Sequence, residues 1–166
     1  MTRSVIACVA AAFLAVAGSA FPVHAAQSKE NAVAEKNQKI AVVERMIAAW
    51  NNQDWKLVGE LFTENGVLHS MMLEPVVGRQ QIADRIIALG AGVSQIELEV
   101  RNMGVVGDVV IVERVDRFVY KGHSGAVPVV GVIEVEGDKI SEWREYYDRA
   151  QLVSEMGLKQ DFHGAH

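Results

Sequence analysis

Two short segments of the chain carry charged side chains at a spacing that suits proton transfer. Residues 109–118 read VVIVERVDRF and residues 143–148 read WREYYD. In a β-strand every second side chain points to the same face. Each segment therefore presents three side chains together: Arg114, Asp116 and Phe118 from the first, and Trp143, Glu145 and Tyr147 from the second. The aromatic members favour an inward orientation, which would place two carboxyl groups and one guanidinium in an apolar cavity.

Two carboxyl groups beside one guanidinium can divide the work of acid and base catalysis. Their mutual repulsion raises the pKa of one carboxyl group, while the guanidinium keeps the pKa of the other low. A proton donor and a proton acceptor then coexist at neutral pH. Buried charges are usually paired, either for chemistry or as a structural ion network. Alternating charges on an exposed strand face would give the same sequence pattern, and periodicity alone does not separate the two arrangements.

The first half of the chain is expected to supply the helices. From Ile40 to Trp50 apolar residues recur every three or four positions, which is typical of an amphipathic helix. Capping and turn residues then divide the chain further. The predicted elements are a helix over 40–50, a short helix from the N-cap Asp54 to Phe62, a turn at 63–66, a strand at 67–72 and a third helix from Gly78.

The second half of the chain changes to a period of two, which predicts strands. The expected strands cover residues 96–101, 109–120, 126–136 and 139–151, with turns at Gly107-Asp108 and Gly137-Asp138. Helices that come first and a meander of strands that comes last predict an α+β fold, in which N-terminal helices cover one antiparallel-rich sheet.

Composition is that of one ordinary globular domain. The chain has 166 residues, of which 50% are hydrophobic and 22% are charged. This balance excludes a disordered or fibrous protein. Lys and Arg number 16 against 21 Asp and Glu, so the formal net charge is −5. We expect no nucleic-acid partner, because an acidic domain lacks the basic surface that binds phosphate groups.

The N-terminal segment is expected to be removed. Residues 1–25 begin with a basic residue, continue with a short apolar run and end in small residues, which is the pattern of a cleavable signal peptide. The protein is then exported, periplasmic or secreted, with no membrane attachment after cleavage. Its single cysteine, Cys8, would leave with the signal peptide, so no disulfide is expected. The rest divides into a flexible leader at 26–38, one domain at 39–152 and a C-terminal tail at 153–166.

Several segments together resemble the limonene-1,2-epoxide hydrolase family. They are residues 66–71 (GVLHSM), 74–79 (EPVVGR), 113–116 (ERVD), 131–140 (GVIEVEGDKI) and 143–148 (WREYYD), in this order. The resemblance implies a cone-shaped, curved mixed β-sheet whose helices close a deep pocket. This is the nuclear transport factor 2-like fold, shared with SnoaL-like proteins and ketosteroid isomerase and also grouped as cystatin-like.

The same resemblance implies a reaction. Water opens an epoxide of a small hydrophobic, terpene-like or cyclic substrate to a vicinal diol in one step, without a covalent intermediate. By position, Arg114 is the bridging arginine, Asp116 the general acid and Glu145 the general base, where the family has Asp. The family's water-holding Tyr and Asn correspond to Leu68 and Ser70 here. The residues expected to bind substrate and water are Leu68, Ser70, Phe118, Trp143 and Tyr147. No metal and no organic cofactor are expected.

Two other functions fit the same fold. One is an isomerase or cyclase that acts on a steroid-like or polyketide-like ring, for which a single carboxylate base near an oxyanion-stabilising donor suffices. The other is a non-catalytic, secreted module that binds a ligand. Under every one of these functions a homodimer through the outer face of the sheet is expected by analogy.

Overall fold

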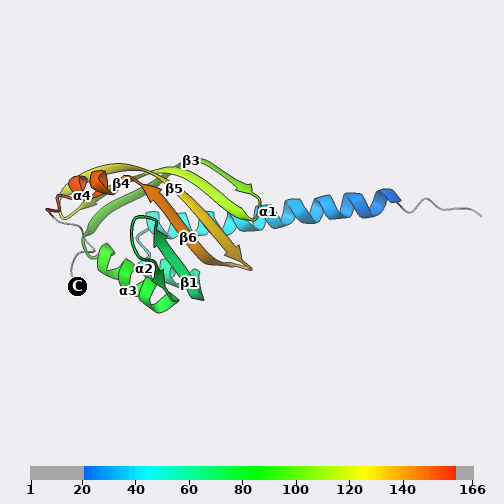
Figure 1. The fold of residues 1–166 in the computed structure, drawn as a ribbon, viewed down its shortest axis with the longest axis horizontal. Coiled ribbons are helices and arrows are strands. Elements are labelled where there is room, and N and C mark those ends of the chain that lie inside the picture. The colour runs from blue at the N-terminus through cyan, green and yellow to red at the C-terminus, as the bar shows by residue number, and fades with distance from the viewer. Residues whose placement is uncertain (1–20, 160–166) are drawn as a thin grey trace, which may run out of the picture.

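A curved sheet of six strands wraps around the N-terminal helices in the computed structural model, which describes residues 21–159 and the side chains from residue 27 (Figure 1). The elements in chain order are α1 (Phe21–Asn51), α2 (Trp55–Glu60), β1 (Phe62–Ser70), β2 (Val76–Val77), α3 (Arg79–Gly90), β3 (Val93–Val106), β4 (Val109–Tyr120), β5 (His123–Glu136), β6 (Lys139–Tyr147) and α4 (Arg149–Glu155). The strand order is β2-β1-β6-β5-β4-β3. β1 runs parallel to β6 and the other neighbours are antiparallel, which confirms the expected α+β class and mixed sheet.

The helices pack their apolar residues against the concave face of the sheet. Val43 and Met46 of α1 are fully buried in the main core. Asp54 caps α2, because its carboxylate accepts a hydrogen bond from the Leu57 amide at 3.0 Å, as the sequence predicts. The expected end of this helix at Phe62 is wrong. Phe62 instead begins β1, where it is completely buried and pairs with Ile140 of β6.

β1 contains the segment that the sequence marks as a turn. The register between β1 and β6 shifts between Phe62 and Val67, so residues 63–66 form an irregular stretch inside the strand. An Asn-Gly pair suits such a bulge as well as it suits a turn. The strand then leads directly to Ser70, which pairs with Glu145.

Tight turns join the long strands of the meander. Lys121 and Gly122 both have positive φ, at 47° and 86°, which fits a two-residue hairpin turn. β5 therefore begins at His123, earlier than the predicted Ala126, and pairs at once with Tyr120. The other two turns lie at the predicted glycines.

The C-terminal boundary differs from the prediction. β6 ends at Tyr147 instead of continuing to residue 151, because Asp148 accepts a hydrogen bond from the Gln151 amide at 3.0 Å and caps α4. Met156, just beyond this helix, is buried in a cluster with Phe118. The first residues of the expected tail at 153–166 therefore belong to the domain. Residues 160–166 lie outside the described residues.

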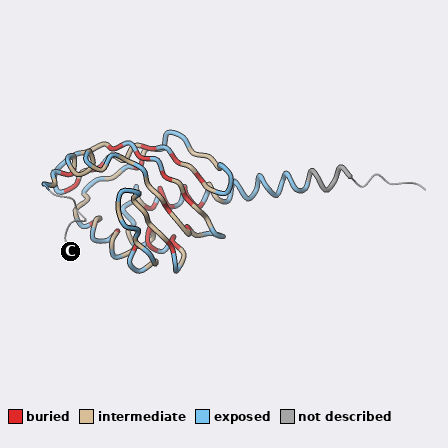
Figure 2. The backbone as a smooth tube through the Cα atoms, in the orientation of Figure 1, coloured by how far each residue is buried: buried red, intermediate tan, exposed pale blue. Residues whose placement is uncertain are grey.

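The expected flexible leader is helical. Residues 26–38 continue α1 without a break, and residues 27–38 are exposed along the part of the helix that projects from the domain (Figures 1 and 2). Their Ala, Glu, Lys and Gln content favours a helix even without packing. The signal-peptide prediction falls largely on residues 1–20, outside the described residues. Within the described part of the chain, no helix has the length and apolar character needed to cross a membrane.

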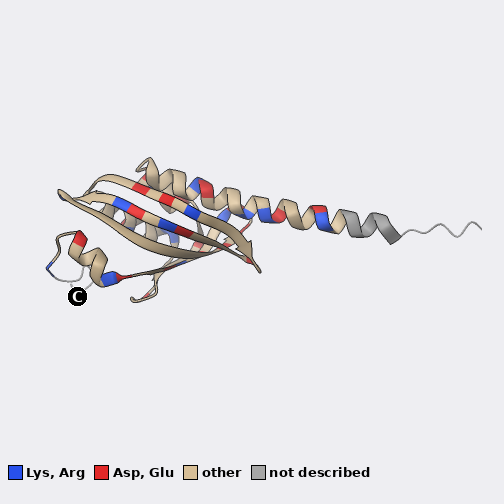
Figure 3. Cartoon of the chain, turned by 90° about the horizontal axis from the view of Figure 1, so that it is seen from above, with Lys and Arg blue, Asp and Glu red and all other residues tan. Residues whose placement is uncertain are grey.

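The convex face of the sheet carries ion pairs. Arg117 Nε lies 2.9 Å from Glu99 Oε2, and Arg144 Nη1 lies 2.9 Å from Glu134 Oε1. Figure 3 shows basic and acidic residues interspersed along the strands and along α1. The charges on this face are thus separated by the sheet from those on its concave face.

Candidate active site

Arg114 lies at the centre of a charged cluster on the concave face of the sheet. Its side chain is 2% exposed. The Nε and Nη2 atoms donate to the two oxygens of Asp116, at 2.7 and 3.0 Å, and Nη2 also donates to Glu145 Oε1. The structure thus brings together the three charged residues singled out in the sequence. Burial of Arg114 excludes the alternative that these charges occupy an exposed strand face.

Gly131 makes this contact possible. Arg114 is on β4 and Glu145 is on β6, so β5 lies between them and the two strands are about 10 Å apart, twice the spacing of neighbouring strands. Gly131 of β5 pairs with Glu145. A Cβ at Gly131 would lie 3.1 Å from Arg114 Nη1 and 3.3 Å from Trp143 Nε1. The missing side chain therefore gives the guanidinium room to cross β5.

Replacing Gly131 with Ala should disturb this crossing. The added methyl group forces Arg114, Trp143 or Val112 to move, and overpacking of this kind costs about 1–3 kcal/mol. Urea unfolding followed by tryptophan fluorescence measures the loss. Gly104→Ala in β3 is the matched control, because a Cβ there meets nothing within 4 Å. Equal free energies of unfolding for the two variants would contradict the packing argument.

Burial and charge oppose each other in the cluster. Burial by itself lowers the pKa of Arg114, but the charges of Asp116 and Glu145 raise that pKa above its ordinary value, so the guanidinium stays protonated. Burial also raises the pKa of Glu145, and the negative charge of Asp116 adds to the effect, while Arg114 opposes it. Glu145 is thus a stronger proton acceptor than an exposed glutamate, and its pKa is coupled to the charge of Asp116.

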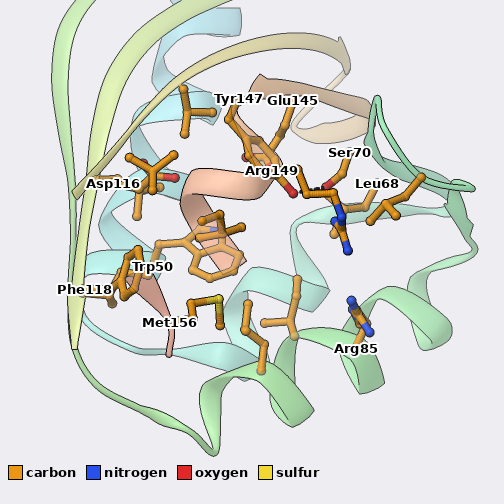
Figure 4. Close-up of a pocket in the computed structure, with 18 of the residues that line it drawn as sticks. Trp50, Leu68, Ser70, Arg85, Asp116, Phe118, Glu145, Tyr147, Arg149 and Met156 are labelled. Carbon is orange, nitrogen blue, oxygen red and sulfur yellow. Dashed lines mark hydrogen bonds between the residues drawn. The ribbon is translucent and has the colours of Figure 1, made fainter. Parts of the chain in front are cut away.

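A cavity of about 190 Å³ opens beside this cluster. This volume suits a small ligand. The five residues expected to bind substrate and water all line it: Leu68, Ser70, Phe118, Trp143 and Tyr147. Figure 4 labels four of them, Leu68, Ser70, Phe118 and Tyr147. The rest of the wall is largely apolar, and residues such as Trp50, Leu98 and Met156 contribute to it. Apolar walls and a few convergent polar groups are typical of a small-molecule site.

Two hydroxyl groups lie beside Glu145. Tyr147 donates a hydrogen bond to Ser70 Oγ at 3.1 Å, and Ser70 pairs with Glu145 across the β1–β6 ladder. Burial raises the pKa of Tyr147, so its phenol remains a proton donor at neutral pH. His69 does not join them, since it does not line the cavity and its Nε2 lies 3.0 Å from the carbonyl of Leu73.

Two arginines of the cavity wall were not predicted from the sequence. Arg85 comes from α3 and Arg149 begins α4, and both are half-buried. Residue type alone does not single them out, because Arg85 lies in an ordinary amphipathic helix and α4 was not expected. Within residues 21–159, no three His, Cys, Asp or Glu side chains are grouped as a metal site would require.

The chain matches the model of the SnoaL-like domain over residues 43–143. It belongs to this family. The matched part of the SnoaL-like domain runs from the buried face of α1 to Trp143 of β6, so it includes Arg114 and Asp116 and ends just before Glu145.

Solved structures show the same architecture as this SnoaL-like domain. An LEH-like epoxide hydrolase from M. tuberculosis has a TM-score of 0.66 and 24% identity, with 74% of this chain and 91% of that chain covered. A protein with a ketosteroid isomerase-like fold from Catenulispora acidiphila has a TM-score of 0.63 and 24% identity, with coverage of 70% and 92%. A protein described as a SnoaL-like polyketide cyclase, from Shewanella putrefaciens, has a TM-score of 0.65 and 14% identity, with coverage of 72% and 96%. At these identities the likeness establishes the nuclear transport factor 2-like fold.

Proposed function

We propose that this SnoaL-like domain hydrolyses epoxides of small hydrophobic compounds, terpene-like or cyclic, to vicinal diols in a single step. The observation that carries the proposal is Arg114, buried at the wall of an apolar cavity and hydrogen-bonded to both Asp116 and Glu145. An LEH-like epoxide hydrolase with the same fold supports it. The arrangement supplies an acid and a base on one wall, which epoxide opening needs at the same moment.

The reaction uses both carboxyl groups at once. Glu145 takes a proton from water, and the water oxygen forms a bond to one epoxide carbon. The C–O bond to that carbon breaks, and its electron pair goes to the epoxide oxygen, which takes the proton of Asp116. The alkoxide is otherwise a poor leaving group. Transfer of a proton from Glu145 back to Asp116 then restores the starting state, and Arg114 holds both groups throughout.

Ser70 and Tyr147 are proposed to hold the attacking water. Their hydroxyl groups lie on the side of Glu145, so they take the place of the Tyr and Asn that the family resemblance leads one to expect. This placement also supports Glu145, and not Asp116, as the base.

Removing either hydroxyl should slow the chemistry more than it weakens binding. We expect Ser70→Ala and Tyr147→Phe to lower kcat by about 10- to 100-fold, since a misplaced reactant can cost roughly a hundredfold in rate. KM should change little, because the apolar wall remains. Steady-state kinetics on a cyclic epoxide measures both parameters. Tyr146→Phe is the matched control, because Tyr146 is 45% exposed on the convex face; a loss of kcat equal to that of Tyr147→Phe would contradict the proposed water site.

A diol assay tests the proposed reaction. The protein is incubated with limonene oxide, cyclohexene oxide and related cyclic epoxides, and products are separated by gas chromatography. We expect saturable diol formation above the spontaneous rate for at least one of them. Conversion of a ring substrate to an isomer that contains no added water, with no diol from any epoxide, would instead support the isomerase or cyclase alternative.

A further inference from the structure

Two arginines from different helices meet at the wall of the cavity. Figure 4 shows the guanidinium groups of Arg85 and Arg149 pointing toward one another, on a different side of the cavity from Phe118. Burial lowers the pKa of Arg85, and the positive charge of Arg149 lowers it further. The fold therefore holds two half-buried cations close enough to repel each other. Two guanidinium groups that face one another at a cavity wall favour the binding of an anion at this point.

Charged residues of both signs line the cavity around this arginine corner, which consists of Arg85 and Arg149. Asp116 and Glu145 are both hydrogen-bonded to Arg114. Glu74 also lines the cavity, from an exposed loop. Arg85 interacts electrostatically with Tyr147 and Tyr120 as well as with Arg149. The arginine corner thus places two cations in a cavity whose wall is otherwise largely apolar.

The arginine corner lies close to the reacting groups. Tyr147 interacts electrostatically with both Glu145 and Arg149, so one side chain separates the two sites. The cavity of about 190 Å³ has room for a ligand with a single small ring or a short chain. A guanidinium binds a carboxylate through two parallel hydrogen bonds, which gives both orientation and affinity.

We propose that Arg85 and Arg149 form a carboxylate-binding site, and that the substrate is a small cyclic or short-chain epoxide that carries a carboxylate. The anion binds at the arginine corner, and the apolar part of the substrate places the epoxide beside Asp116 and Glu145. The substrate class rests on the proposed epoxide hydrolysis, whereas the carboxylate site does not.

Binding of unreactive ligands tests the site by itself. Calorimetric titration compares cyclohexanecarboxylate with cyclohexylmethanol, which has a similar shape and no charge. We expect the acid to bind at least about tenfold more tightly, because a charge-assisted hydrogen bond is about twice as strong as a neutral one. Raising the salt concentration should weaken binding of the acid only. Equal affinity of the wild-type protein for the two ligands overturns the proposal, whatever the variants do.

Variants locate the anion. Arg85→Gln and Arg149→Gln should each remove most of the preference for the acid and leave the affinity for the alcohol within about twofold. Arg101→Gln is the matched control, since Arg101 is 49% exposed and pairs with Glu99 away from the cavity. Thermal unfolding shows whether each variant is folded. A preference for the acid that persists in folded Arg85→Gln and Arg149→Gln places the anion elsewhere and overturns the assignment.

Turnover separates this proposal from the reaction proposed above. Diol formation is compared for an epoxycyclohexanecarboxylate and its methyl ester, and we expect kcat/KM to be at least tenfold higher for the acid. Tight binding of the acid without any diol from either compound would reject hydrolysis and keep the carboxylate site. Equal hydrolysis of acid and ester, with equal binding of cyclohexanecarboxylate and cyclohexylmethanol, would reject the site and keep hydrolysis.

Discussion

Asp116→Asn and Glu145→Gln are each expected to lower kcat/KM for an epoxide by about 10²- to 10⁴-fold, the usual contribution of a positioned acid or base. Each change keeps the size of the side chain and removes one partner of the proton transfer. An amide at position 116 could not protonate the epoxide oxygen, and an amide at position 145 could not accept a proton from water. Because both groups act in the same step, the double variant should be little slower than either single variant.

The same assay separates the hydrolase from its alternatives. Glu113→Gln is the control, because Glu113 is next to Arg114 in β4 but exposed on the opposite face, where it accepts a hydrogen bond from Asn102. Its kcat/KM should be that of the wild-type protein. A large loss in only one of the two carboxyl variants would fit an enzyme with a single base. Full activity in both would reject the roles assigned to Asp116 and Glu145.

Arg114→Met is expected to lower the free energy of unfolding by about 3–5 kcal/mol, as removal of one partner from a buried ion pair usually does. Arg114 is the cation that touches both carboxyl groups, and burial otherwise disfavours their charged forms. Methionine keeps the apolar stem and removes the charge. Urea unfolding at neutral pH measures the loss, and activity should also disappear.

Two further variants show whether the loss comes from unpaired charge. Arg117→Met in the same strand removes an arginine that is 51% exposed and paired with Glu99, so a change within about 0.5 kcal/mol is expected. Adding Asp116→Asn and Glu145→Gln to Arg114→Met removes the stranded carboxylates and should restore much of the stability. If Arg114→Met unfolds with the wild-type free energy, the buried cluster does not have the energetic role assigned to it.

The strand period predicted which side chains share a face, whereas the inward orientation of that face was inferred from the aromatic members and from the family resemblance. Arg114 and Asp116 lie on one face because they are two positions apart, and so do Glu145 and Tyr147 on β6. The same local reasoning found the Asp54 cap. These features depend on a few consecutive residues, for which dihedral preferences and side-chain alternation are sufficient.

Features that depend on distant residues were not predicted. In the sequence Gly131 is an ordinary strand glycine, because nothing there shows that β4 and β6 flank its strand. An isolated glycine in a strand does indicate that another group approaches the backbone closely, but it does not identify that group. α4 was assigned to the end of a strand because its Asp148 cap directly follows the alternating residues of β6. The arginine corner depended on that missed helix, since Arg149 is its first residue.

Single-turnover hydrolysis in oxygen-18 water tests the central claim most directly. Excess protein is mixed with each of a panel of cyclic epoxides, and the first diol formed is analysed by mass spectrometry. If Glu145 activates water that attacks the epoxide directly, the diol of the first turnover contains one oxygen-18 atom. A first-turnover diol without oxygen-18 would show that a carboxylate of the protein had attacked the ring, and no diol above the spontaneous rate would show that the cluster does not hydrolyse epoxides.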